Sequence, residues 1–247
     1  LTVGSDVNPL HTDNFEEVSF GPILYGAKKL GMHIHTRYEV SNNAGQDICD
    51  IVNNEGFDFL LVGSGISMSD SPDDIAATRY RTSFYNRYFK RFKAPESWFY
   101  PGALLKDKTK MFIARSNCDV GVFINRNFVK ATNTLVVISS EEDLFLLDYT
   151  RTLLKATHGS VGIVAKMSTT TPGHDQILKE LWDFVSSIPQ TQLLPDKDLT
   201  PGLFNSYNFM LIGYNTWNDV SEHRKEALQK MPSTLILNKN KRSSSDN

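Results

Sequence analysis

The chain has 247 residues, 40% of them hydrophobic and 22% charged, with a net charge of −2. These values are typical of a globular protein with enough core for one large or two small domains, and the small net charge excludes a global attraction to nucleic acid or acidic membranes. Two cysteines, Cys49 and Cys118, are too few for a disulfide framework or a four-cysteine zinc site, and we expect them to be buried thiols.

Helix and strand patterns alternate along the chain, which is typical of a parallel sheet covered by helices on both faces. In the first half we expect helices at 14–31 and 45–56, and strands at 32–40, 57–63 and 119–125. His33 and His35 alternate on the strand 32–40 and share one face. In the second half we expect helices at 140–159, 174–188 and 221–230, and strands at 134–139, 160–167, 191–194, 207–213 and 233–238.

Two pairs of segments repeat in the same order. FDFLLVGSG (57–65) aligns with YNFMLIGYN (207–215), and NCDVGVFINRN (117–127) aligns with KMPSTLILNKN (230–240). The sequence therefore predicts two copies of one α/β unit, residues 1–130 and 131–240, followed by a polar tail at 241–247. Because the paired strands are much further apart in the first copy, an insertion is expected at about 67–102.

The second copy opens with a strand–helix–strand stretch (134–167), whereas the first copy starts directly at the helix 14–31. A sheet without its central strand leaves interior backbone groups unpaired, at ~1–3 kcal/mol each. We therefore expect the first repeat to be incomplete in this chain, with further residues before Leu1.

The ordered set of segments resembles a known family. CDVGVFINRNF (118–128), TLVVISSEEDLFLLDYTRTLLK (134–155), NEGFDFLLVGSG (54–65) and the final YNFMLIGYN and STLIL are similar to the cytosolic C-terminal region of plant and fungal potassium/proton antiporters. The resemblance implies an α/β fold of two tandem doubly wound parallel sheets, each similar to universal stress proteins. It also implies a non-catalytic domain that regulates or dimerises the transporter, without a cofactor, at the cytosolic face of a Golgi or endosomal membrane.

The loop Gly63, Ser64 and Gly65 is the candidate nucleotide site, because a glycine-rich loop after a buried strand can cradle a phosphate. Universal stress proteins that bind ATP space their glycines as G-x-x-G, and here Ile66 occupies the position three after Gly63. The second copy has no glycine after Gly213, and the bulky Trp217 that follows would obstruct a phosphate.

The loop is therefore expected to be a turn with a positive φ angle, and a soluble nucleotide-binding stress protein is the alternative function. An enzyme of the related nucleotide α-hydrolase type would need an intact phosphate loop and a reactive pocket, and the sequence has neither. The acidic run at 141–143 opens a helix, where carboxylates complement the helix dipole, so it needs no catalytic explanation.

The insertion carries cations and aromatic residues at helical spacing. Its candidate contact residues are Arg79, Arg87, Tyr88, Lys90, Arg91 and Phe92. The expected partners are the transporter's own membrane domain, a second copy of the chain in a homodimer, or an anionic membrane surface. Packing of the aromatic rings on the sheet, with the cations in solvent, is the alternative without a partner. Nucleic acid is not expected as a partner.

The strands at 119–125 and 233–238 are a second candidate for contact between chains. Both are apolar, and each is expected to lie at the edge of its own sheet, where unpaired backbone groups can pair with another chain. They are therefore the expected seam of a homodimer.

Overall fold

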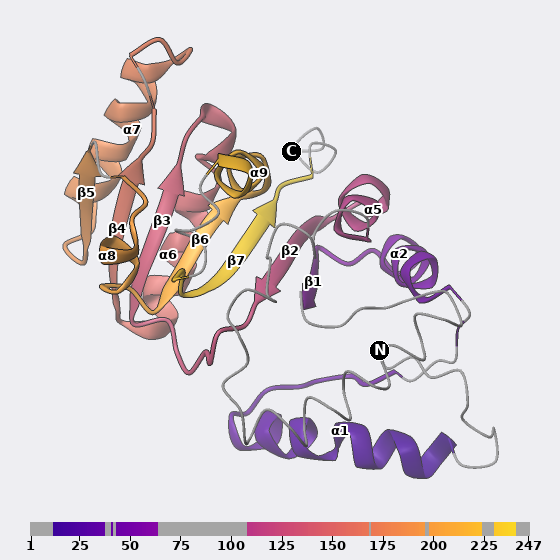
Figure 1. The fold of residues 1–247 in the computed structure, drawn as a ribbon. Coiled ribbons are helices and arrows are strands. Elements are labelled where there is room, and N and C mark those ends of the chain that lie inside the picture. The colour runs from indigo at the N-terminus through magenta and orange to yellow at the C-terminus, as the bar shows by residue number, and fades with distance from the viewer. Residues whose placement is uncertain are drawn as a thin grey trace.

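The computed structural model describes residues 12–37, 41, 43–63, 108–167, 169–195, 198–223 and 230–240. Seven strands form one sheet in the order β1-β2-β7-β6-β3-β4-β5 (Figure 1). The strands are β1 (Phe59–Gly63), β2 (Asp119–Ile124), β3 (Asn133–Ile138), β4 (Ser160–Ala165), β5 (Thr191–Pro195), β6 (Phe209–Gly213) and β7 (Ser233–Asn238). All neighbours are parallel except β2 and β7, which pair antiparallel.

Helices cover both faces of this sheet. The described helices are α1 (Thr12–Lys29), which lies apart from the sheet, α2 (Ala44–Glu55), α5 (Lys108–Arg115), α6 (Leu146–Thr157), α7 (His174–Ser187), α8 (Pro201–Phe204) and α9 (Tyr214–His223), with a 3₁₀ turn η3 at Glu141–Asp143. One buried cluster joins the sheet to α8 and α9, and a second joins it to α6 and α7. Cys49 and Cys118 are both buried, as expected, and desolvation raises the pKa of each thiol.

The α/β class and the mostly parallel sheet are confirmed, with the two expected sheets joined into one. Strands β3 to β7 of the second half form a five-stranded parallel sheet, and β1 and β2 of the first half continue it across the antiparallel β2–β7 pair. The expectation that β2 and β7 are edges suited to pairing between chains is wrong for this chain, because each strand already pairs with the other.

The alignment of the repeated strands is off by one residue at β2 and β7. Phe59 pairs with Asp119, and its repeat counterpart Phe209 pairs with Ser233, so Asp119 corresponds to Ser233. The match of the two sequence segments places Asp119 opposite Pro232 instead. A shift of one residue turns every side chain of a strand to the other face of the sheet. With the structural register, an approximate two-fold axis passes through the Val122–Ile236 pair and relates the two halves.

Most predicted elements are present, with three differences. Residues 32–37 are irregular where a strand was expected, so His33 and His35 are simply exposed. Helix α9 begins at Tyr214 directly after β6, earlier than the helix expected at 221–230, and residues 224–229 of that expected helix lie outside the described residues. The helix expected at 140–159 is the turn η3 followed by α6, which ends at His158 in the left-handed region (φ 51°).

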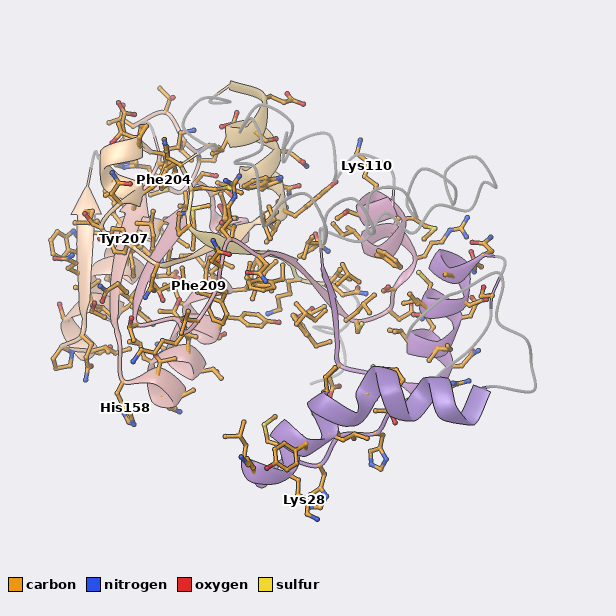
Figure 2. All side chains as sticks on the ribbon, turned by 60° about the horizontal axis from the view of Figure 1, so that its bottom comes forward. Lys28, Lys110, His158, Phe204, Tyr207 and Phe209 are labelled. Carbon is orange, nitrogen blue, oxygen red and sulfur yellow. The ribbon has the colours of Figure 1, made fainter. Side chains whose placement is uncertain are left out.

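Figure 1 shows α1 apart from the sheet, and Figure 2 shows Lys28 on that helix far from the packed side chains around Phe204 and Phe209.

A part-buried polar contact links the halves beside the β2–β7 pair. The Tyr149 hydroxyl on α6 donates to Asp119 Oδ2 on β2 at 2.9 Å, and the backbone N–H of Asn240 donates to Asp119 Oδ1 at 2.7 Å. Burial, followed by the hydrogen bond to this carboxylate, raises the pKa of Tyr149 above its ordinary value. The neutral phenol is therefore the form that the folded protein favours.

The Tyr149→Phe substitution should lower the free energy of unfolding by about 1–2 kcal/mol near neutral pH, because Asp119 loses a donor. A raised pKa in the folded state gives a contribution that is complete below pH about 10 and declines as the pH rises further. Urea unfolding at pH 8 and above pH 10 measures both effects, with Tyr25→Phe, at an exposed site, as the control. If the free energies of unfolding of the wild type and Tyr149→Phe differ by the same amount at all pH values, this account is contradicted.

Candidate functional site

The candidate site lies where β3 and β6 end side by side. From β3 the chain continues to β4 on one side of the sheet, and from β6 it continues to β7 on the other side. Loops diverge at such a switch point, and in open α/β sheets ligands bind at the carboxyl ends of the strands beside it. The segment Ser139–Asp143 follows β3, and α9 follows β6 with no intervening loop.

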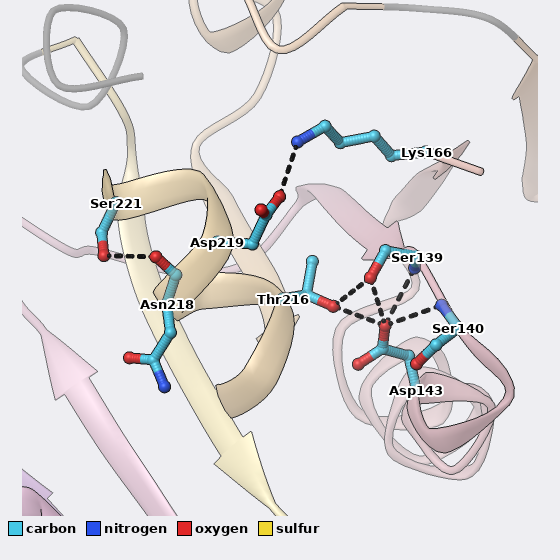
Figure 3. A network of polar contacts seen from close by, with 8 residues as sticks. All are labelled: Ser139, Ser140, Asp143, Lys166, Thr216, Asn218, Asp219 and Ser221. Atoms are coloured by element: carbon cyan, nitrogen blue, oxygen red, sulfur yellow. Dashed lines mark hydrogen bonds and ion pairs between the residues drawn. The ribbon is translucent and has the colours of Figure 1, made fainter. Parts of the chain in front are cut away.

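The carboxylate of Asp143 occupies this position (Figure 3). Its Oδ2 accepts hydrogen bonds from the backbone N–H of Ser139 at 2.8 Å, the N–H of Ser140 at 3.2 Å, and the Ser139 hydroxyl at 3.2 Å. The Thr216 hydroxyl, from the first turn of α9, donates to the same oxygen at 2.6 Å. Asp143 is only 2% exposed. Loop N–H groups and hydroxyls of this kind hold a phosphate in a nucleotide site, and here they bind a side chain of the protein itself.

Gly213, the last residue of β6, provides the space for this carboxylate. A Cβ atom at Gly213 would lie 1.9 Å from Asp143 Oδ1, which is far below van der Waals contact. The glycine that closes the repeated strand motif is therefore needed for close approach of a side chain. At its counterpart Gly63, a Cβ atom would meet nothing within 4 Å, and the φ of Gly63 is not positive.

Two further contacts fix α9 at the ends of the strands. Lys166, just after β4, forms an ion pair with Asp219 on α9 at 3.2 Å, and the Asn215 side chain donates to Glu142 at 2.8 Å. Together with the Thr216–Asp143 bond, these contacts tie α9 to the segments after β3 and β4. Figure 3 shows the Thr216–Asp143 and Lys166–Asp219 contacts. The switch point is therefore closed by polar contacts within the chain.

The predicted site residues have mixed outcomes. Gly63 ends β1 in an extended conformation, so the expected positive φ is wrong at this residue. Ser64 and Gly65 lie outside the described residues. The basic and aromatic contact set also lies outside them, namely Arg79, Arg87, Tyr88, Lys90, Arg91 and Phe92. In the second copy, Trp217 was expected to obstruct a phosphate. It belongs to α9, and its side chain is fully buried in the core between that helix and the sheet.

The role of Asp143 is not among the predictions from the sequence. Carboxylates interact favourably with a helix N-terminus, and this alone explains the acidic run at 141–143. The explanation does not distinguish one acid of the run from another, so it does not predict that Asp143 is buried and hydrogen-bonded. A stronger signal is present in the chain. Ser139 and Ser140 follow the apolar run 135–138, and an acid stands three residues after Ser140, which is the pattern of a capping box. Gly213 closes the neighbouring strand.

A cavity of about 630 Å³ lies between α6 and α7, and Glu141 and Glu142 of the segment after β3 form part of its wall. The Arg151 guanidinium in its wall is 3.1 Å from Asp148 and lies over the Phe184 ring at 5.0 Å. Its other charged lining residues are Glu141, Glu142, Glu180, Asp183 and Lys239. The lining is thus mainly acidic, which disfavours nucleotides and other anions. Among the described residues, no group of three or more His, Cys, Asp or Glu side chains is placed to hold a metal ion.

Comparisons with known proteins identify the fold. No protein-family model and no curated protein matches the chain. A universal stress protein from Archaeoglobus fulgidus is 11% identical, with a TM-score of 0.52, over 97% of this chain and 84% of that one. A universal stress protein from Pseudomonas aeruginosa, described as putative, is 10% identical, with a TM-score of 0.52, over 96% of this chain and 81% of that one.

The cytoplasmic domain of a prokaryotic cation chloride cotransporter is also similar. It is 10% identical, with a TM-score of 0.52, over 96% of this chain and 83% of that one. At these identities the likeness establishes a universal-stress-protein fold and nothing finer. No helix among the residues that the structure describes has the length and hydrophobicity needed to cross a membrane.

Proposed function

We propose that this chain is a non-catalytic regulatory and dimerisation domain of a membrane ion transporter, and specifically of a potassium/proton antiporter. The observation that carries the proposal is the Asp143 carboxylate at the switch point, because it uses the donors that would otherwise bind a phosphate. The likeness to the cytoplasmic domain of a cation chloride cotransporter supports a role beside a transporter. The segments that resemble potassium/proton antiporters support the finer assignment.

In this proposal the domain acts through contacts and not through chemistry. It forms a homodimer at the cytosolic face of an intracellular membrane, Golgi or endosomal by the resemblance. Contacts that differ between two transport conformations shift their populations, which is all that regulation requires. The basic and aromatic set of the insertion, Arg79, Arg87, Tyr88, Lys90, Arg91 and Phe92, is the proposed contact surface toward the membrane domain or the anionic lipid surface.

Charge reversal of this surface tests the proposal in the full-length transporter. The triple substitution Arg87→Glu, Lys90→Glu and Arg91→Glu should change potassium/proton exchange in vesicles by about fivefold or more, the lower end of ordinary allosteric coupling. The matched control reverses three exposed lysines of the described helices, Lys110, Lys155 and Lys179. Equal exchange rates for both triple variants and the wild type would contradict the proposed contact surface.

The alternative is a soluble nucleotide-binding stress protein. The fold favours it, since two of the similar structures are named as universal stress proteins. It requires a phosphate site, and the second copy would have to displace Asp143 from four hydrogen bonds to provide one. Saturable binding of ATP or AMP in a calorimetric titration distinguishes this alternative from the regulatory domain.

A further inference from the structure

The two halves contribute unequally to the sheet. Among the described residues, the second half provides five strands and the first half provides β1 and β2. In the second half, β6 pairs with β7 on one edge and with β3 on the other. Its repeat counterpart β1 pairs with β2, and in the described part of the chain no strand lies on its other edge. The edge of β1 that corresponds to the β3 side of β6 is therefore free there.

The side chains of β1 are exposed in the same asymmetric way. Leu61 is 57% exposed, whereas its counterpart Leu211 in β6 is 2% exposed. Leu211 belongs to the cluster beneath α6 and α7, which includes Leu146 and Leu181. By comparison with Leu211, a helix equivalent to α6 is expected to cover Leu61. No element among the described residues covers it.

Helix α1 and the segment after it are also uncovered. By order along the chain they correspond to α7 and β5, whose apolar side chains pack on the sheet. In the first half the corresponding apolar side chains are exposed, namely Ile23, Tyr25, Leu30, Met32 and Ile34. β5 forms a strand by pairing with β4. The described first half has no counterpart of β4, which explains why residues 32–37 are irregular.

We propose that the free edge of β1 is the docking site of a strand–helix–strand unit that precedes Leu1 in the same polypeptide. Its first strand pairs in parallel with β1, as β3 pairs with β6, and its helix covers Leu61. Its second strand provides the edge on which residues 32–37 become a strand. The occupant is a pair of apolar, β-branched strands joined by an amphipathic helix.

The order of elements identifies the source of this unit. In the second half, β3, α6 and β4 come before α7 and take residues 133–165. The same order in the first half places the unit before α1, where the structure describes no such elements. The inference does not depend on the proposed function, because such a unit can precede Leu1 in a soluble protein as well as in a transporter.

One substitution in two lengths of the polypeptide tests the proposal. Leu61→Glu should leave the urea midpoint of the 247-residue chain unchanged, because Leu61 is exposed there. In a chain extended upstream by the strand–helix–strand unit alone, the same substitution should lower the midpoint by about 1 M or more, because it buries a charge beneath the added helix. Val129→Glu, at a site 88% exposed, should be neutral in both lengths, and Leu211→Glu should be destabilising in both.

Two results would overturn the proposal. One is a Leu61→Glu substitution with the same effect in both lengths. The other is a natural start at or just before Leu1, because no unit could then precede α1. A further result separates this proposal from the proposed function. If the upstream residues contain the strand–helix–strand unit but no membrane-spanning segments, the docking site stands and the transporter assignment fails.

Discussion

Replacing Asp143 with alanine is expected to lower the free energy of unfolding by about 3–4 kcal/mol. The substitution removes one acceptor and leaves the buried hydroxyl of Thr216 and the part-buried donors of Ser139 and Ser140 without their partner, at about 1–3 kcal/mol for a fully buried unsatisfied group. It also releases α9 from the segment after β3. Urea unfolding followed by far-ultraviolet circular dichroism measures the change.

Two variants make this result specific to the buried carboxylate. Asp183→Ala removes an exposed acid from α7 and should change the free energy of unfolding by less than about 0.5 kcal/mol. Asp143→Asn keeps one carbonyl oxygen for the donors but loses the charge, so its stability should lie between those of the wild type and Asp143→Ala. If Asp143→Ala and Asp183→Ala are equally stable, the proposed hydrogen-bond network does not hold the switch point together.

Gly213→Ala is expected to be the second strongly destabilising substitution, at about 2–3 kcal/mol. The added methyl group would lie 1.9 Å from Asp143 Oδ1, and that carboxylate is held by its donors and cannot simply rotate away. Thermal or urea unfolding of the single variant gives the cost. The counterpart Gly63→Ala should be nearly neutral, because a Cβ atom there meets nothing within 4 Å.

A double-mutant cycle separates this collision from any backbone effect at Gly213. In the Asp143→Ala background the colliding oxygen is absent, so adding Gly213→Ala should cost much less than it does in the wild type. Strictly additive costs for the two substitutions would mean that Gly213 is needed for another reason, and the close approach described here would not explain it.

The sequence predicted the sheet well because its central strands are apolar on both faces. Runs such as 134–138 and 209–212 have few alternatives to a buried parallel strand, and the internal repeat identified which strands are counterparts. The ends of helices were predicted where a glycine adopts a positive φ. Gly56, with a φ of 69°, ends α2 in this way.

Contacts between distant segments could not be predicted in the same way. The alternation at 32–37 favours a strand, but a strand needs a neighbour, and the described chain offers none beside it. The correspondence of β2 with β7 depends on how each strand pairs with its neighbour, β1 or β6, and a match of short apolar runs cannot fix this correspondence to one residue. The link between Asp143 and Thr216 joins residues far apart in the chain, and only the topology brings them together.

Reading the natural transcript upstream of the Leu1 codon tests the central claim most directly. A transporter domain predicts about ten or more apolar runs of ~20 residues, each long enough to span a membrane. These should be followed by one strand–helix–strand stretch immediately before residue 1. A start codon shortly before Leu1, with no such runs, would contradict the claim and leave the soluble nucleotide-binding alternative as the better explanation of the fold.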